Sequence, residues 1–416
     1  MLLSGIPKKV MNLFRNKYLG KSGVKDGLYN ILAFGIYIGM TQIVIMPFIA
    51  RISKSDENFS AIIIFITIFN MLCIAVGDEL GNTRMVLYTK YKEKKLSGDF
   101  HPALALLLIS FAVILLVTGL IVDIPPSDIA TYCFIGALGI TRYFAMSSFR
   151  LERRFFHIFI VSLAYCIGSL PGIWAALRYG FFLAPFASGE AAAVLAVLYF
   201  RLQDKDRLIN MTVTEEFRPS VKKYGQLGTV SLMTNLIIYL DRLIIYPLLG
   251  AAPMAVYYSA SAMSKILGMI NNPVASYALS VISKKDDSSG PKITGMLFRL
   301  IFPLLAVTAA FSAVLTYAAV LLLYPQYFDS AIVLIIPVSL ASALSIVSYL
   351  VRTVIIRFYS IRKFLYANVV YVIVFLISIL IFSYLWGITG FAWAVCLSRG
   401  VQFAVYLRLM KPGTTK

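Results

Sequence analysis

Apolar residues in this chain are gathered into long runs that are separated by short polar segments. Each run is about 20 residues long, the length at which a helix crosses a hydrocarbon core about 30 Å thick. Twelve spans are predicted, at residues 28–50, 59–77, 101–122, 127–147, 155–177, 180–200, 225–249, 254–281, 296–323, 329–351, 364–386 and 388–408. The polar segments are too short for a separate soluble domain. The pattern therefore predicts an all-α integral membrane protein.

Composition and charge placement agree with this fold class. Apolar residues make up 60% of the 416 and charged residues 14%, against about 25% charged in a typical soluble protein. Basic residues occur at every second polar segment, as expected of cytoplasmic loops, and the opposite segments hold only Arg51, Lys54 and Arg178. Both termini are therefore expected in the cytoplasm. The net charge of +19 forms no continuous basic face with interleaved aromatics, so nucleic acid is not an expected partner.

The longest internal polar stretch, residues 201–224, divides the spans into two sets of six. An internal repeat supports this division, because TQIVIMPFIA at 41–50 aligns with DRLIIYPLLG at 241–250. Six spans in each half place both halves in the same orientation, which predicts a parallel repeat. The predicted domains are an N-terminal six-helix lobe at 1–205, a cytoplasmic linker at 206–224 and a C-terminal six-helix lobe at 225–416.

A small set of ionisable residues is expected inside the spans. The set contains Arg142, Glu190, Asp241, Arg242, Lys265 and Arg399. A charge at the bilayer centre costs at least about 2.5–3.5 kcal/mol, so such residues commonly mark a transport pathway. The excess of cations suits an anionic head group such as a pyrophosphate, whose oxygens accept strong hydrogen bonds from Arg and Lys.

The four cations, Arg142, Arg242, Lys265 and Arg399, are therefore predicted to bind substrate, and the two acids, Glu190 and Asp241, to couple an ion. An alternative is pairing inside the membrane, such as Glu190 with Arg142, that only holds helices together. Near the cytoplasmic end of span 254–281, Asn271-Asn272-Pro273 predicts a break in the helix. Pro273 is therefore a candidate hinge, with an ordinary bend as the alternative.

Catalytic and metal-binding patterns are missing from the sequence. The four cysteines lie within apolar runs, and the histidines, His101 and His157, are far apart with no acid or cysteine at ligand spacing. No G-x-x-x-x-G-K-[ST] motif occurs, which excludes ATP binding through a P-loop. The sequence thus predicts a transporter rather than an enzyme. No metal or cofactor is expected, with coupling to H⁺ or Na⁺ left open.

Two segments resemble a known family. DRLIIYPLLGAAPMAVYYSASAMSKI at 241–266 is similar to the polysaccharide-transport flippases, the O-antigen (Wzx-type) branch of the multidrug/oligosaccharidyl-lipid/polysaccharide (MOP) exporter superfamily. That family often shows an Asp, a Gly about nine residues on and a Tyr in the following turn. Here these residues are Asp241, Gly250 and Tyr257. GDELGNTRMVLYTKY at 77–91 is similar to the family's Gly-rich stretch leaving the second span, although its two acidic residues depart from the family's pattern.

The resemblance implies two parallel, MATE-like six-helix bundles around a central cavity that opens alternately to each side of the bacterial inner membrane. It implies an undecaprenyl-pyrophosphate-linked O-antigen or capsular oligosaccharide as substrate, and so a role in lipopolysaccharide or capsule biosynthesis. Membrane lipids, a polysaccharide polymerase and a chain-length regulator are the candidate partners. Two alternatives stay open. An acid-dominated cavity would favour an ion-coupled multidrug exporter of the same fold, and a long outer loop would favour a membrane glycosyltransferase or polysaccharide polymerase.

Overall fold

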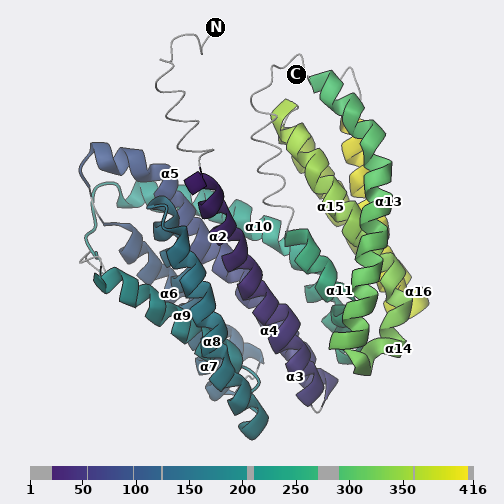
Figure 1. Ribbon diagram of the computed structural model, residues 1–416, viewed down its shortest axis with the longest axis horizontal. Helices are drawn as coiled ribbons and strands as arrows, with labels where there is room; N and C mark the ends of the chain where they lie inside the picture. The colour runs from purple at the N-terminus through teal and green to yellow at the C-terminus, as the bar shows by residue number, and fades with distance from the viewer. Residues whose placement is uncertain are drawn as a thin grey trace. The chain divides into compact units, whose positions relative to one another are not determined.

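Every regular element in the described part of the chain is helical (Figure 1). The computed structural model describes residues 21–53, 55–96, 98–122, 125–203, 210–269, 290–358 and 361–410. The α-helices are α2 (Lys21–Ile38), α3 (Met46–Ile52), α4 (Asp56–Leu72), α5 (Glu79–Glu93), α6 (Phe100–Val122), α7 (Pro126–Leu151), α8 (Phe155–Tyr179), α9 (Ala184–Gln203), α10 (Phe217–Leu249), α11 (Ala251–Met269), α13 (Gly290–Leu323), α14 (Phe328–Ala331), α15 (Ile335–Phe358) and α16 (Ile361–Leu409). Two π-helical segments, η1 (Gly39–Ile45) and η2 (Cys73–Asp78), and two 3₁₀ segments, η4 (Pro325–Tyr327) and η5 (Ile332–Leu334), lie between them.

Ten helical stretches of the described residues are long and apolar enough to cross a membrane. The predicted multi-pass membrane protein is therefore confirmed. The last stretch, Tyr366–Leu409, contains two of the expected spans, because α16 is kinked at Trp386 and Gly387. The expected span at 254–281 is described only as far as Met269. The count of twelve and the cytoplasmic termini stay predictions.

The kink in α16 folds the helix into two arms that lie against each other. Gly387 has φ 57°, in the left-handed region that favours glycine. A Cβ at Gly390 would lie 1.8 Å from the carbonyl oxygen of Phe382, so no side chain fits between the arms there. The arms thus pack backbone to backbone beside α15, and residues of opposite arms can meet at hydrogen-bond distance.

The second span continues further than the sequence predicts. Residues 77–91, expected to leave the membrane as a Gly-rich loop, are helical, and α5 runs on to Glu93. The glycines serve helix packing instead of a turn. A Cβ at Gly77 would lie 2.4 Å from the carbonyl oxygen of Ile140, and one at Gly81 would lie 2.3 Å from the side chain of Ser147. Both contacts are on α7, so the glycines let α7 approach this helix closely.

The chain forms two compact units. The first consists of Met1–Ile45 with Phe65–Tyr239, and the second of Met46–Ile64 with Leu240–Lys416. In the first unit α8 packs along both α9 and α2, and α7 packs against η2 and α9. In the second, α15 packs against α11, α13 and α16, and Figure 1 shows α13, α15 and α16 running side by side. The predicted division into two lobes and a linker stays a prediction.

Small residues bring α8 and α9 together in the first unit. A Cβ at Gly168 would lie 2.2 Å from the Cβ of Ala192, and one at Gly172 would lie 2.4 Å from the carbonyl oxygen of Ala184. In lipid there is no hydrophobic driving force for helix association, so close packing at small residues stabilises the helix pair instead. This packing fixes the position of α9, which carries Glu190 into the interior of the unit.

The substitution Gly172→Leu is predicted to destabilise the first unit. A leucine there would overlap the α9 backbone, and overpacking of this kind costs about 1–3 kcal/mol. The midpoint of thermal unfolding in detergent should fall, while Gly35→Leu, where a Cβ meets nothing within 4 Å, should leave it unchanged. Equal midpoints for the two variants would contradict the packing argument.

The residues before α10 are fixed to the first unit by a buried aspartate. Helix α10 begins at Phe217, inside the range predicted as a linker. The carboxylate of Asp99, 1% exposed, accepts hydrogen bonds from the backbone N of Thr214 at 2.6 Å, from its Oγ1 at 2.5 Å and from the Tyr91 hydroxyl at 2.6 Å. The backbone N of Asp99 donates to the carbonyl oxygen of Thr212 at 2.8 Å. The start of α10 is thereby tied to the turn between α5 and α6.

Ion pairs reinforce this attachment. The Nζ atoms of Lys90 and Lys94 each lie 2.5 Å from a carboxylate oxygen of Glu216. These two donors hold the pKa of the Glu216 carboxyl below its usual value of 4.5. A lowered pKa stabilises the folded state above the unfolded-state pKa, and this stabilisation is lost as the pH falls through the folded-state pKa. The attachment should therefore weaken in acid.

Glu216→Gln is predicted to lower the thermal unfolding midpoint at about pH 7 and to have a smaller effect at about pH 4. The effect is smaller in acid because the native chain itself loses the ion pair there, whereas glutamine has no ion pair to lose. The measurement is the difference in midpoint between the native chain and the variant at the two pH values. Glu215→Gln is the matched control, since Glu215 is exposed and lies 3.3 Å from Lys94. A difference that does not depend on pH would rule out the assigned role of the Glu216 carboxylate.

Candidate functional site

A buried ion pair joins α7 to α9 in the first unit. The Nε of Arg142 donates to Oε2 of Glu190 at 2.6 Å, and its Nη2 donates to Oε1 at 2.8 Å. Arg142 is 2% exposed and Glu190 is fully buried. This two-point geometry matches the planar guanidinium to the carboxylate and gives a strong charge-assisted contact. The pairing considered from the sequence as an alternative is therefore present.

Aromatic side chains surround the pair. The guanidinium carbon of Arg142 lies 4.4 Å from the ring centre of Tyr37 and 4.6 Å from that of Tyr143. The Tyr37 hydroxyl donates to Oε1 of Glu190 at 3.4 Å, and Tyr165 packs on the Tyr37 ring. Both charges are thus satisfied inside the unit. The substrate-binding role predicted for Arg142 and the ion-coupling role predicted for Glu190 stay predictions, and each would require this pair to open.

Arg242, in the second unit, is in a different environment. Its side chain is buried, with 4% exposed, and its guanidinium carbon lies 4.6 Å from the ring centre of Tyr258. Within the described part of the chain, its Nε and Nη2 atoms have no hydrogen-bond partner. A buried donor without an acceptor costs about 1–3 kcal/mol, and more when it is charged. Arg242 therefore keeps its charge and two donor atoms that no described residue accepts from.

Arg399, on the second arm of α16, is also held by uncharged groups. Its guanidinium carbon lies 4.3 Å from the ring centre of Tyr371, and its Nη1 donates to Oε1 of Gln402 at 3.2 Å. Among the described residues no carboxylate lies within ion-pair distance of Arg399, and its side chain is partly exposed. Like Arg242, it keeps a net positive charge.

Asp241 shows why the resemblance motif has its spacing. The Tyr257 hydroxyl donates to Oδ2 of Asp241 at 3.0 Å, and both side chains are buried. Gly250 has φ 90°, which allows the chain to turn from α10 into α11 and brings Tyr257 back against Asp241. The three motif residues thus form one turn with a buried hydrogen bond. The ion-coupling role of Asp241 stays a prediction.

Two predicted residues cannot be placed at the site. The backbone of Lys265 lies on α11, but its side chain is outside the described residues, and so is the candidate hinge Pro273. Across the described segments, no group of three or more His, Cys, Asp or Glu residues is arranged to hold a metal ion.

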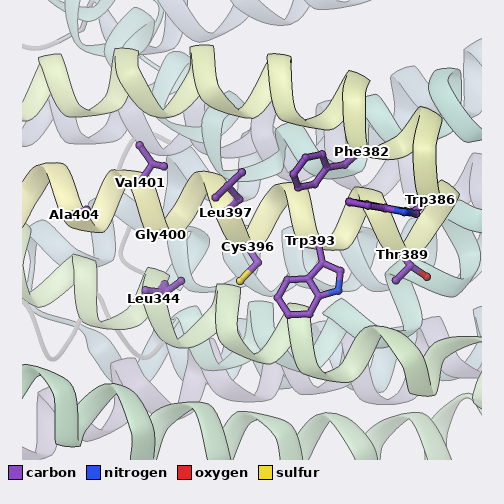
Figure 2. A pocket seen from close by; sticks show the side chains of 10 residues that line it. All are labelled: Leu344, Phe382, Trp386, Thr389, Trp393, Cys396, Leu397, Gly400, Val401 and Ala404. Carbon is purple, nitrogen blue, oxygen red and sulfur yellow. The ribbon is translucent and has the colours of Figure 1, made fainter.

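A separate pocket of about 830 Å³ lies along α16 (Figure 2). Figure 2 shows its lining along the two arms, with Phe382, Trp386 and Trp393 at one end, Gly400 and Ala404 at the other, and Leu344 contributed by α15. The residues that line this pocket are uncharged, so the pocket includes neither Arg242 nor Arg399.

Several residues around the predicted cations carry no signal in the sequence. Tyr37 contacts the Arg142 pair from a helix far away along the chain, Tyr165 contacts it from α8, and Gln402 and Asn368 belong to opposite arms of α16. Tyrosines and amides are common in apolar runs, so composition does not single them out. The one local signal is Tyr143, which directly follows Arg142.

Comparison with known proteins shows which solved structures share this fold. No model of a protein family and no curated protein sequence matches the chain. Among solved structures, a lipid II flippase, MurJ, in an inward closed conformation matches with a TM-score of 0.65 at 14% identity, over 92% of this chain and 87% of that one. An inward-facing multidrug resistance MATE family transporter of the MOP superfamily matches with a TM-score of 0.67 at 13% identity, over 92% and 97%. An outward-facing MATE transporter gives 0.59 at 12% identity, over 92% and 94%. The chain has the fold of MOP-superfamily transporters.

Sequence identities this low establish the fold alone. The resemblance predicted from the sequence is thus confirmed at the level of the superfamily fold, and membership of the O-antigen flippases stays a prediction. The structural neighbours are flippases and transporters, which agrees with the prediction of a transporter rather than an enzyme.

The Arg142–Glu190 pair yields a prediction for stability. Glu190→Leu should destabilise the protein by about 3–5 kcal/mol, because it leaves the Arg142 guanidinium buried without its partner. The double variant Arg142→Leu with Glu190→Leu should recover most of that loss, because replacing both charges by apolar groups is often neutral. Chemical unfolding in detergent of the two single variants and the double variant gives the coupling energy. Additive losses would mean that the pair does not stabilise the fold.

Proposed function

We propose that this chain is a flippase that moves undecaprenyl-pyrophosphate-linked O-antigen or capsular repeat units across the bacterial inner membrane. Transport would run from the cytoplasmic to the periplasmic leaflet by alternating access. The fold supports a transporter, and MurJ, a solved structure with this fold, is a lipid II flippase. The substrate class rests on the chemistry of the buried cations.

The observation that carries the proposal is the contrast between Arg142, which is in an ion pair, and two arginines that form no ion pair with any residue the structure describes. Arg142 is neutralised by Glu190, whereas Arg242 and Arg399 are held by tyrosine rings and an amide. Aromatic faces and amides stabilise a guanidinium without cancelling its charge. Two such arginines suit a diphosphate, because guanidinium groups bind phosphate oxygens through paired hydrogen bonds.

An ion-coupled multidrug exporter is the competing function, and the MATE transporters share the fold equally well. Export of cationic drugs would favour a cavity with uncompensated acids. In the first unit the predicted acid, Glu190, is already bound by Arg142, which favours the flippase.

The energy source is part of the proposal. A gradient of H⁺ or Na⁺ would drive the return of the empty carrier. Asp241, one of the two predicted coupling residues, accepts a hydrogen bond from the hydroxyl of Tyr257, and Glu190, the other, is paired with a guanidinium. Proton or sodium binding to Asp241 would compete with this hydrogen bond.

The test is transport of an undecaprenyl-pyrophosphate-linked repeat unit in proteoliposomes, read as exposure of the sugar to an impermeant lectin. Arg242→Ala and Arg399→Ala should each lower the initial rate about 10–100-fold, because each removes charged hydrogen bonds worth about 1.5–3 kcal/mol. Lys265→Ala should have an effect in the same direction. Arg408→Ala, at an exposed position near the end of α16, is the matched control and should keep the native rate.

The outcomes separate the two functions. Sugar exposure by the native chain but not by the arginine variants supports the flippase. Full rates in both arginine variants would remove the cationic site from the proposal. Efflux of a cationic dye by the native chain, without sugar exposure, would establish the multidrug exporter instead.

A further inference from the structure

A chain of side-chain hydrogen bonds links the two arms of α16 and ends on Arg399. The Nη1 of Arg399 donates to Oε1 of Gln402 at 3.2 Å, and Nε2 of Gln402 donates to Oδ1 of Asn368 at 2.9 Å. The Tyr406 hydroxyl donates to the same Oδ1 at 3.4 Å. Asn368 lies on the first arm, and the other three residues lie on the second. Gln402 is 5% exposed, so water does not readily replace these partners.

The donors and acceptors in this series of hydrogen bonds fix the orientation of the Gln402 amide. A carboxamide has one accepting oxygen and one donating nitrogen, and the two ends have nearly the same shape. Arg399 only donates, so it requires the oxygen of Gln402. The nitrogen then points to Asn368, whose oxygen is available as the acceptor. The reversed amide would place an NH₂ group against a guanidinium and an oxygen against an oxygen.

Among the residues that the structure describes, the other contact of Arg399 is also neutral. Its guanidinium carbon lies 4.3 Å from the ring centre of Tyr371, which is 1% exposed. The ring holds one side of the guanidinium plane, and Gln402 holds one nitrogen at its edge. A guanidinium has five N–H donors in a fixed fork, so most of them stay available. The group is therefore held in place while it keeps its charge and its donors.

We propose that Asn368 and Gln402 are positioning residues that aim the guanidinium of Arg399 at the diphosphate of the substrate. Asn368 acts through Gln402, and Gln402 acts on Arg399 directly. This inference rests on the function proposed above, in which Arg399 binds the diphosphate. The neutral amide is essential to it, because a carboxylate at position 402 would hold the guanidinium equally well but would neutralise it.

The experiment measures the Kd of undecaprenyl diphosphate, without sugar, for the purified full chain in detergent, together with the thermal unfolding midpoint of each variant. Asn368→Leu and Gln402→Leu should each raise the Kd about tenfold, the equivalent of about 1.4 kcal/mol of lost orientation.

Gln402→Glu separates positioning from stability. The new carboxylate should pair with Arg399 and leave the unfolding midpoint unchanged or higher, while it raises the Kd more than Gln402→Leu does. A residue with a purely structural role would lose stability and binding together. Ser398→Ala is the matched control, since it removes a cross-arm hydrogen bond to Ser378 of 3.2 Å, one residue from Arg399, without touching the chain of amides. Its Kd should equal the native value.

Arg399→Ala distinguishes the inference from the proposed function. If Arg399→Ala binds undecaprenyl diphosphate as tightly as the native chain, the function assigned to Arg399 fails. If Arg399→Ala weakens binding but Asn368→Leu and Gln402→Leu do not, the proposed function stands and the positioning role is overturned. Equal weakening by Ser398→Ala and Asn368→Leu would also overturn it, because packing between the arms would then explain both.

Discussion

A charge inside a hydrocarbon core costs about 2.5–3.5 kcal/mol even on insertion scales, and this cost decides how the arginines of the spans are held. Arg142 is balanced by an opposite charge and enclosed by tyrosines, which removes it from contact with any ligand while the pair is closed. Arg242 and Arg399 are stabilised by aromatic faces and an amide. Under the proposed function only this second arrangement leaves a charge for substrate, so the partners of an arginine say more about its role than its position in a span.

Close packing of the helices is a second consequence of the lipid environment. Lipid supplies no hydrophobic force between helices, so contact at small residues and buried hydrogen bonds must hold them together. Gly77 and Gly172 bring neighbouring helices to backbone contact, and Gly390 does so for the two arms of α16. Each of these contacts places a polar residue of the candidate site, since α7 carries Arg142, α9 carries Glu190 and α16 carries Arg399. The contacts that hold the helices together therefore also position the residues of the candidate site.

Apolar run length predicted the membrane spans well, because the bilayer thickness acts on each helix locally. The same reasoning failed at 77–91 and at the start of α10, where helices continue beyond the predicted spans and contact distant segments. Of the site, the cations could be found by elimination, but not which of them are paired. Tyr37 reaches Glu190 across 153 positions of sequence, and no local pattern contains that information.

The uncharged partners of Arg399, a tyrosine ring and an amide, have a consequence for the transport cycle under the proposed function. An empty site would hold uncompensated positive charge at a free-energy cost, and a bound diphosphate would relieve it. A ligand shifts a conformational equilibrium only through its different affinity for the two states. If the arginines lie closer to the diphosphate in one conformational state than in the other, the relief of this free-energy cost shifts the equilibrium toward that state. A carboxylate paired with Arg399 would offset this cost in both states and remove the difference, which is a physical reason for amide and tyrosine partners at that position.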